Sequence, residues 1–89
     1  MNNPYIGEYY ALRSPMLGWM IVRVAQLESD GFTCAIVENL EHQYTNEYTP
    51  NRYQSDFIFI RNSFIGSVCF SIGANYNNVS LKMLKLLYE

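Results

Sequence analysis

His42 is the one side chain of this sequence whose ordinary pKa lies near neutrality, so acid–base chemistry would start there. A nucleophilic triad would also need a serine or cysteine beside it, and no spacing in the sequence places one there. The simpler interpretation is a solvent-exposed loop histidine. Two of the three acids Glu38, Glu41 and Glu47 could form a pair of catalytic carboxylates, but such pairs line a cleft, and 89 residues leave little volume for one. We therefore expect a protein that is not an enzyme.

The two cysteines do not indicate a metal or redox centre. Cys34 and Cys69 lie in the apolar runs FTCAIV and FIGSVCFSIG, where a thiol usually behaves as a small buried hydrophobe. Two distant cysteines and one histidine are too few for the usual four-ligand zinc site. Gly66 and Gly73 lack the Lys-Ser/Thr that completes a phosphate-binding loop. The sequence predicts reduced, buried cysteines, with a disulfide as the alternative, and no cofactor or metal.

Acidic residues are concentrated in one segment. Residues 28–48 carry five acids and no Lys or Arg, although the net charge of the chain is only −2. Residues 41–54 add three tyrosines and contain no aliphatic side chain. Tyr, Asn, Thr and acids on a connection between strands are typical of a binding loop. The predicted partner-binding residues are Glu38, Glu41, Tyr44, Glu47, Tyr48 and Tyr53.

Two alternatives to this interpretation stay open. The acids could form a solvated face that keeps the protein soluble, and the tyrosines could pack back over the sheet with only their hydroxyls wet. Glu28 and Asp30 belong to the same acidic segment but lie at the opposite end of the hairpin predicted below, roughly 25 Å away for strands of about eight residues. We expect these two acids to add only long-range steering.

The elements that position these residues are predicted to be β-strands followed by one helix. WMIVRVAQL is β-branched and apolar on both faces, and is therefore expected to be a central strand. Ser29-Asp30-Gly31 has tight-turn chemistry, so 19–40 is expected to form an antiparallel hairpin. DFIFIR is interpreted as a short buried strand. The strands are expected at 8–13, 19–27, 32–40, 56–61 and 64–72.

In the last segment the spacing of the apolar residues changes from every second residue to that of an amphipathic helix, so a helix is predicted over about 78–88. Leu81, Leu84 and Leu87 are expected to face the sheet, and Asn78 or Ser80 to act as the N-cap.

The expected architecture is mainly β (α+β), with residues 1–89 forming a single small domain. About five strands would form a small, strongly curved antiparallel sheet or an SH3-like partly open barrel with one C-terminal helix. The term SH3-like rests on size and strand count. A single three- to five-stranded sheet with the helix laid across it is the alternative.

The N-terminus MNNPYIGEYY lacks the features of a signal peptide. The longest weakly polar run, 64–74, is too short to span a bilayer. A cytoplasmic location and no membrane partner are therefore expected.

Three function classes fit these features. The first is a protein-binding inhibitor or immunity-type factor whose acidic, tyrosine-rich surface covers a basic partner, for example a nucleic-acid-handling protein. The second is an SH3-like adaptor that binds extended peptides in an aromatic groove or at a strand edge. The third is a single-stranded nucleic-acid binder that stacks bases on Tyr9, Tyr10, Trp19 and Phe57, which the lack of clustered Lys/Arg disfavours. Small size and composition suit a phage or mobile-element accessory protein. The oligomeric state stays open.

Overall fold

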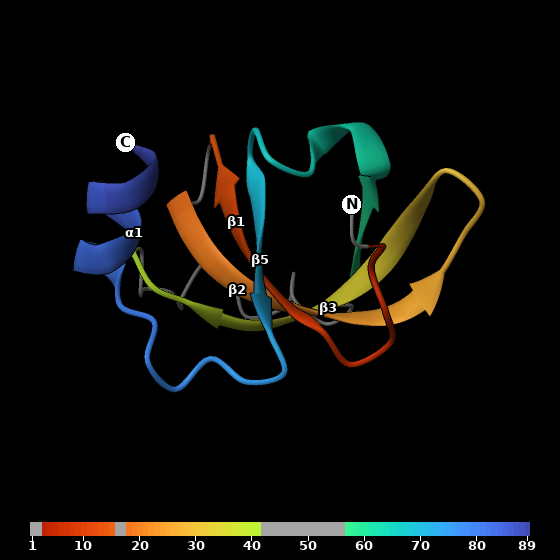
Figure 1. Cartoon of the computed structure of the whole chain (residues 1–89), viewed down its shortest axis with the longest axis horizontal. Helices are drawn as coiled ribbons and strands as arrows, with labels where there is room; N and C mark the ends of the chain where they lie inside the picture. Colours follow the sequence, from red (N-terminus) through yellow and green to blue (C-terminus); the bar gives the residue numbers. More distant parts are fainter. Residues whose placement is uncertain (1–2, 16–17, 42–56) are drawn as a thin grey trace, which may run out of the picture.

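The computed structural model describes residues 3–15, 18–41 and 57–89. Its strands form one antiparallel sheet in the order β4-β3-β2-β1-β5, with a C-terminal helix (Figure 1). This confirms the predicted mainly β architecture of five antiparallel strands and one C-terminal helix. The elements are β1 (Tyr9–Ser14), β2 (Gly18–Leu27), β3 (Gly31–Asn39), β4 (Phe57–Arg61), the 3-10 helix η2 (Asn62–Phe64), β5 (Cys69–Gly73) and α1 (Leu81–Tyr88).

Strands β2 and β3 form the predicted hairpin. Their register pairs Leu27 with Phe32 and Val24 with Cys34, and the turn is closed by the Glu28 N–H, which donates to the Gly31 carbonyl at 2.9 Å. β2 is the central strand of the sheet, as its two apolar faces predict. The register shifts twice along the hairpin, between Ile21 and Val22 and between Val24 and Gln26. Such bulges bend a strand, and both strands are bent in Figure 1.

The fifth strand is shorter than the sequence predicts. It begins at Cys69, because 62–64 form η2 and Gly66 takes a φ of +94°, outside the extended region. The backbone bonds here are local: the Ile65 N–H donates to Asn62 O at 3.1 Å and the Gly66 N–H to Cys69 O at 2.8 Å. Residues 62–68 therefore form a compact connection that joins β4, at one edge of the sheet, to β5, at the other. These two edge strands do not pair among the described residues, so the sheet is open.

One face of the sheet, called the inner face here, carries the larger core cluster. Alternate residues of all five strands meet there, because successive side chains of a strand point to opposite faces. Cys34 and Cys69 belong to this cluster and are buried free thiols, which confirms that prediction. The buried members are Tyr10, Leu12, Met20, Val22, Val24, Phe32, Cys34, Ile60 and Cys69.

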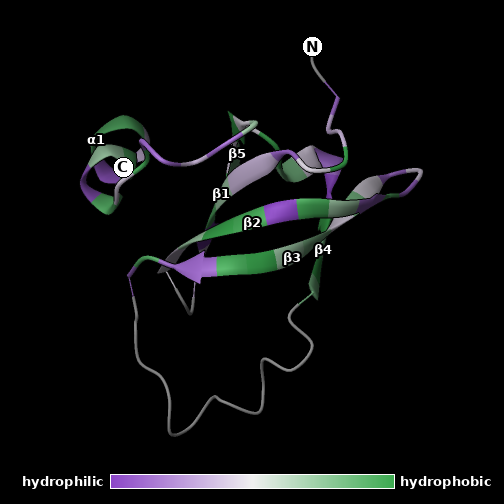
Figure 2. Ribbon diagram, turned by 90° about the horizontal axis from the view of Figure 1, so that it is seen from below, coloured by the Kyte–Doolittle hydropathy of each residue, from purple (hydrophilic) through white to green (hydrophobic). Residues whose placement is uncertain are grey.

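The opposite, outer face carries a second cluster under α1. Ala11 and Trp19 from the sheet pack with Leu84 from the helix, and all three are at most 2% exposed. Figure 2 shows α1 beside β1 and β5, so the helix covers one end of this face. The helix begins at Leu81, later than the predicted start at 78, and the Ser80 Oγ caps it by accepting from the Met83 N–H at 3.1 Å.

The predicted inward face of α1 is only partly correct. Leu84 is buried and Leu81 is half-buried, but Leu87 is 62% exposed. The sheet ends at β5, so no described strand lies beyond this edge for Leu87 to pack against. No described helix has the length and apolar character that a membrane span requires.

Candidate functional site

The structure places two of the six predicted partner-binding residues. Glu38 lies on β3 and is exposed, whereas Glu41 follows β3 and is half-buried. Tyr44, Glu47, Tyr48 and Tyr53 lie outside the described residues, as does His42.

Glu28 and Asp30 lie in the turn at the far end of the hairpin. Asp30 forms an exposed ion pair with Arg61 at 3.2 Å. An ion pair of this kind is screened by solvent and leaves little net charge for steering.

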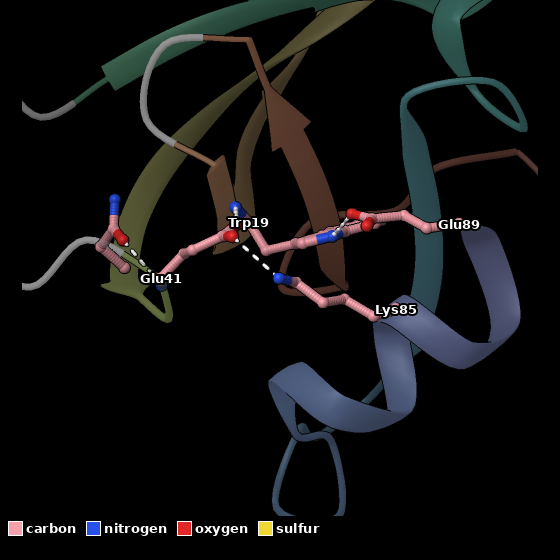
Figure 3. Close-up of polar contacts among 5 residues, drawn as sticks. Trp19, Glu41, Lys85 and Glu89 are labelled. Atoms are coloured by element: carbon pink, nitrogen blue, oxygen red, sulfur yellow. Dashed lines mark hydrogen bonds and ion pairs between the residues drawn. The ribbon is translucent and has the colours of Figure 1, made fainter.

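Glu41 is engaged within the fold. Its Oε1 accepts from the Trp19 backbone N–H at 3.1 Å, and its Oε2 lies 3.1 Å from Lys85 Nζ on α1 (Figure 3). The Glu41 N–H donates to Asn39 Oδ1 at 3.0 Å. One carboxylate thus links the start of β2, the end of β3 and the helix. Its charge is already paired with Lys85, so it attracts a basic partner less than the free carboxylate inferred from the sequence would.

Gly18 makes room for this arrangement. Its φ is +77°, and a Cβ there would collide with the Glu41 side chain. Glycine is the residue that takes this conformation without steric cost. The sequence gives Gly18 only as a turn signal, and its role in admitting Glu41 depends on the tertiary structure.

Trp19 contacts the C-terminal end of α1. Its indole N–H donates to Glu89 Oε2 at 2.5 Å, and its ring contacts Phe70 and Tyr88 at centroid distances of 6.0 and 6.1 Å. The side chain has no exposed surface. Because Trp19 and Tyr10 are both buried, neither can stack on a nucleic-acid base.

The most exposed apolar surface of the described strands lies on β4. Phe57 and Phe59 are 62% and 46% exposed, so the prediction of a buried strand is wrong for this side of β4. Phe57 pairs with Ala35 and Phe59 with Thr33, so both phenylalanines lie on the outer face, beyond the part that α1 covers. The signal was present in the sequence, since these phenylalanines alternate with the inward-facing Ile58 and Ile60 at a period of two.

Glu38 lies on the same face as these aromatics. On β2, Ile21 and Arg23 are two residues apart and therefore share a face. Glu38 pairs with Ile21, and Ala35 pairs with Arg23, so Glu38 lies on the same face as Ala35, the partner of Phe57. We call Glu38, Phe57 and Phe59 the β3–β4 strip. It combines two exposed rings with an exposed acid that has no ion-pair partner in the part of the chain that the structure describes.

A groove lies between β5 and α1. Its walls are mainly apolar, and its volume is about 170 Å³. Phe70 and Ile72 contribute from the strand and Met83, Leu87 and Tyr88 from the helix. The Phe70 and Tyr88 rings are stacked with their centroids 3.8 Å apart, and this contact packs the strand against the end of the helix. The sequence does not predict this groove, because it arises from the position of α1 at an open sheet edge.

A polar network is enclosed on the inner face. Glu8 is only 5% exposed, and its carboxylate accepts from Ser71 Oγ at 2.5 Å and from the Tyr5 N–H at 3.2 Å. Burial, and then the adjacent Glu8 carboxylate, raise the pKa of Tyr10 well above its usual range. The tyrosine hydroxyl therefore stays protonated and donates its hydrogen bond to the Glu8 carboxylate.

Burial also raises the pKa of Cys34 and of Cys69 to about 12. The folded state holds these protons more tightly than the unfolded state, whose thiols ionise near the ordinary value of 9.0. The resulting stabilisation is complete below pH 9 and is lost as the pH rises toward 12. We expect the free energy of unfolding to fall across this window, and less steeply in the Cys34→Ala/Cys69→Ala variant. Equal slopes in urea titrations of the two proteins would show that the thiols contribute nothing.

The described residues contain no group of three or more His, Cys, Asp or Glu side chains that could hold a metal ion. Comparison with protein-family models, with curated proteins and with solved structures finds no match, so the function must be inferred from the geometry of this chain.

Proposed function

We propose that the protein acts by binding another protein and not by catalysis, as an inhibitor or immunity-type accessory factor. Its partner would present a basic surface, as a nucleic-acid-handling protein does. The supporting observation is the β3–β4 strip, where the exposed rings of Phe57 and Phe59 share a sheet face with the exposed Glu38.

The strip has the two ingredients of a protein interface. Aromatic side chains that lose water on binding supply most of the affinity, and charges at the rim accelerate association with a partner of opposite sign. Residues 42–56, with their acids and tyrosines, connect β3 to β4 in the sequence. The predicted contacts Tyr44, Glu47, Tyr48 and Tyr53 therefore lie in the segment between the two strands of the strip.

The experiment is a pull-down from the native host at low and high salt, followed by kinetics with the purified partner. The double variant Glu38→Lys/Glu47→Lys should bind the partner with an association rate about tenfold lower at low salt. The difference should be smaller at high salt, because exposed charges are screened over about 8–10 Å. Phe57→Ala should instead speed dissociation, at a cost on the order of 2 kcal/mol in binding free energy. Glu41 is left unchanged because its loss would disturb the helix contact.

Two matched variants control these measurements. Glu28→Lys reverses an exposed acid at the far end of the hairpin, and Phe64→Ala removes an exposed ring from η2, outside the strip. Phe64→Ala should leave the partner kinetics nearly unchanged, and Glu28→Lys, which alters only long-range steering, should slow association clearly less than the double charge reversal. If the double charge reversal leaves association and its salt dependence as they were, the acidic segment is a solvated face and the inhibitor proposal fails.

We also propose that the sheet forms a partly open, SH3-like barrel and that the protein is cytoplasmic. Two observations support the barrel. Ile60 of one edge strand and Cys69 of the other belong to a single core cluster, and the short segment 62–68 connects the two edge strands in the chain. Two buried free thiols suit a reducing compartment.

A further inference from the structure

We infer that the β5–α1 groove binds an extended segment of a partner protein, which adds as a strand to β5. This surface is separate from the β3–β4 strip. The two are contributed by opposite edge strands of the sheet.

The hydrogen-bonding groups of β5 face outward at Ser71. β5 pairs with β1 in a register that matches Leu12 with Cys69 and Tyr10 with Ser71, and the Arg13 N–H donates to Val68 O at 2.8 Å. Hydrogen-bonded and non-hydrogen-bonded pairs alternate in an antiparallel ladder, so the backbone groups of Cys69 and Ser71 point away from β1.

The bond from the Gly66 N–H to the Cys69 carbonyl agrees with this direction. Ile65 bridges Cys69 at this edge, and no described strand lies beyond β5, so the open part of the edge is the N–H and C=O of Ser71. An extended backbone matches such an edge in both donor and acceptor.

The helix supplies a side-chain pocket beside that edge. Leu87 is 62% exposed and lines the groove with Met83, opposite Phe70 and Ile72. The volume of the groove, about 170 Å³, is close to the roughly 150 Å³ of an apolar cavity that holds one benzene molecule. One large aliphatic or aromatic side chain of an added strand therefore fits.

The test uses a displayed library of random twelve-residue peptides, selected on the whole protein. We expect enriched peptides with large aliphatic or aromatic residues at alternate positions. Leu87→Glu should weaken binding of the best synthetic peptide at least about tenfold, equivalent to 1.4 kcal/mol. Leu86→Glu is the matched control, because Leu86 is 75% exposed and does not line the groove.

Peptide backbone chemistry tests strand addition without altering the protein. N-methylation should abolish binding at the peptide residue that pairs with Ser71 and be tolerated at the residues on either side of it. The inference is overturned if no peptide is enriched, if Leu87→Glu has no effect, or if N-methylation has no alternating effect. It is also overturned if sedimentation shows a dimer that Leu87→Glu dissociates, since a second copy would then occupy the groove. Phe57→Ala should not change peptide affinity, so this inference and the proposed function can fail separately.

Discussion

Replacing Trp19 with alanine is expected to lower the free energy of unfolding by on the order of 3–5 kcal/mol. The side chain is fully buried between the sheet and α1, and its ring contacts both Phe70 and Tyr88. Truncation leaves a cavity and also removes the indole N–H that donates to Glu89. Urea unfolding followed by circular dichroism would measure the loss.

Trp19→Phe separates the two contributions to that loss. It retains an aromatic ring but removes the donor to Glu89, so its effect should be clearly smaller than that of alanine. If Trp19→Phe and Trp19→Ala were equally destabilising, the hydrogen bond rather than the packing would hold α1 to the sheet.

Leu84→Ala is expected to cost on the order of 2–5 kcal/mol through lost burial and a cavity. Leu84 is the buried residue of α1 and packs on Ala11 and Trp19. For a domain of this size the melting temperature should fall by about 10 °C or more. Leu86→Ala, at a position that is 75% exposed, should change it little. A melting temperature unmoved by Leu84→Ala would mean that the helix is not docked in solution.

Local chemistry accounts for the parts of the fold that the sequence predicts well. The hairpin of β2 and β3 follows from two apolar runs around Asp30-Gly31, and the cap of α1 from Ser80 ahead of an amphipathic run. The buried cysteines follow from their apolar neighbours. Each of these depends on residues close together in the chain.

The parts that the sequence does not predict depend on contacts between distant residues. Leu87 has the same helical spacing as a core residue but lies beyond the last strand, and Phe57 is exposed because β4 is an edge. The sequence predicts Glu41 to be a partner-binding acid, whereas in the structure Lys85 of α1 lies 3.1 Å from its carboxylate. Strand order and helix placement decide all three, and neither can be deduced from local periodicity.

Amide hydrogen exchange tests most directly whether the β3–β4 strip recognises a partner protein. The exchange of the whole protein is measured alone and in complex with the partner recovered by pull-down. We predict added protection in peptides covering 31–41 and 57–61, with unchanged exchange at the 28–30 turn. Protection confined to 69–73 and 81–89, or no change at 57–61, would contradict the claim.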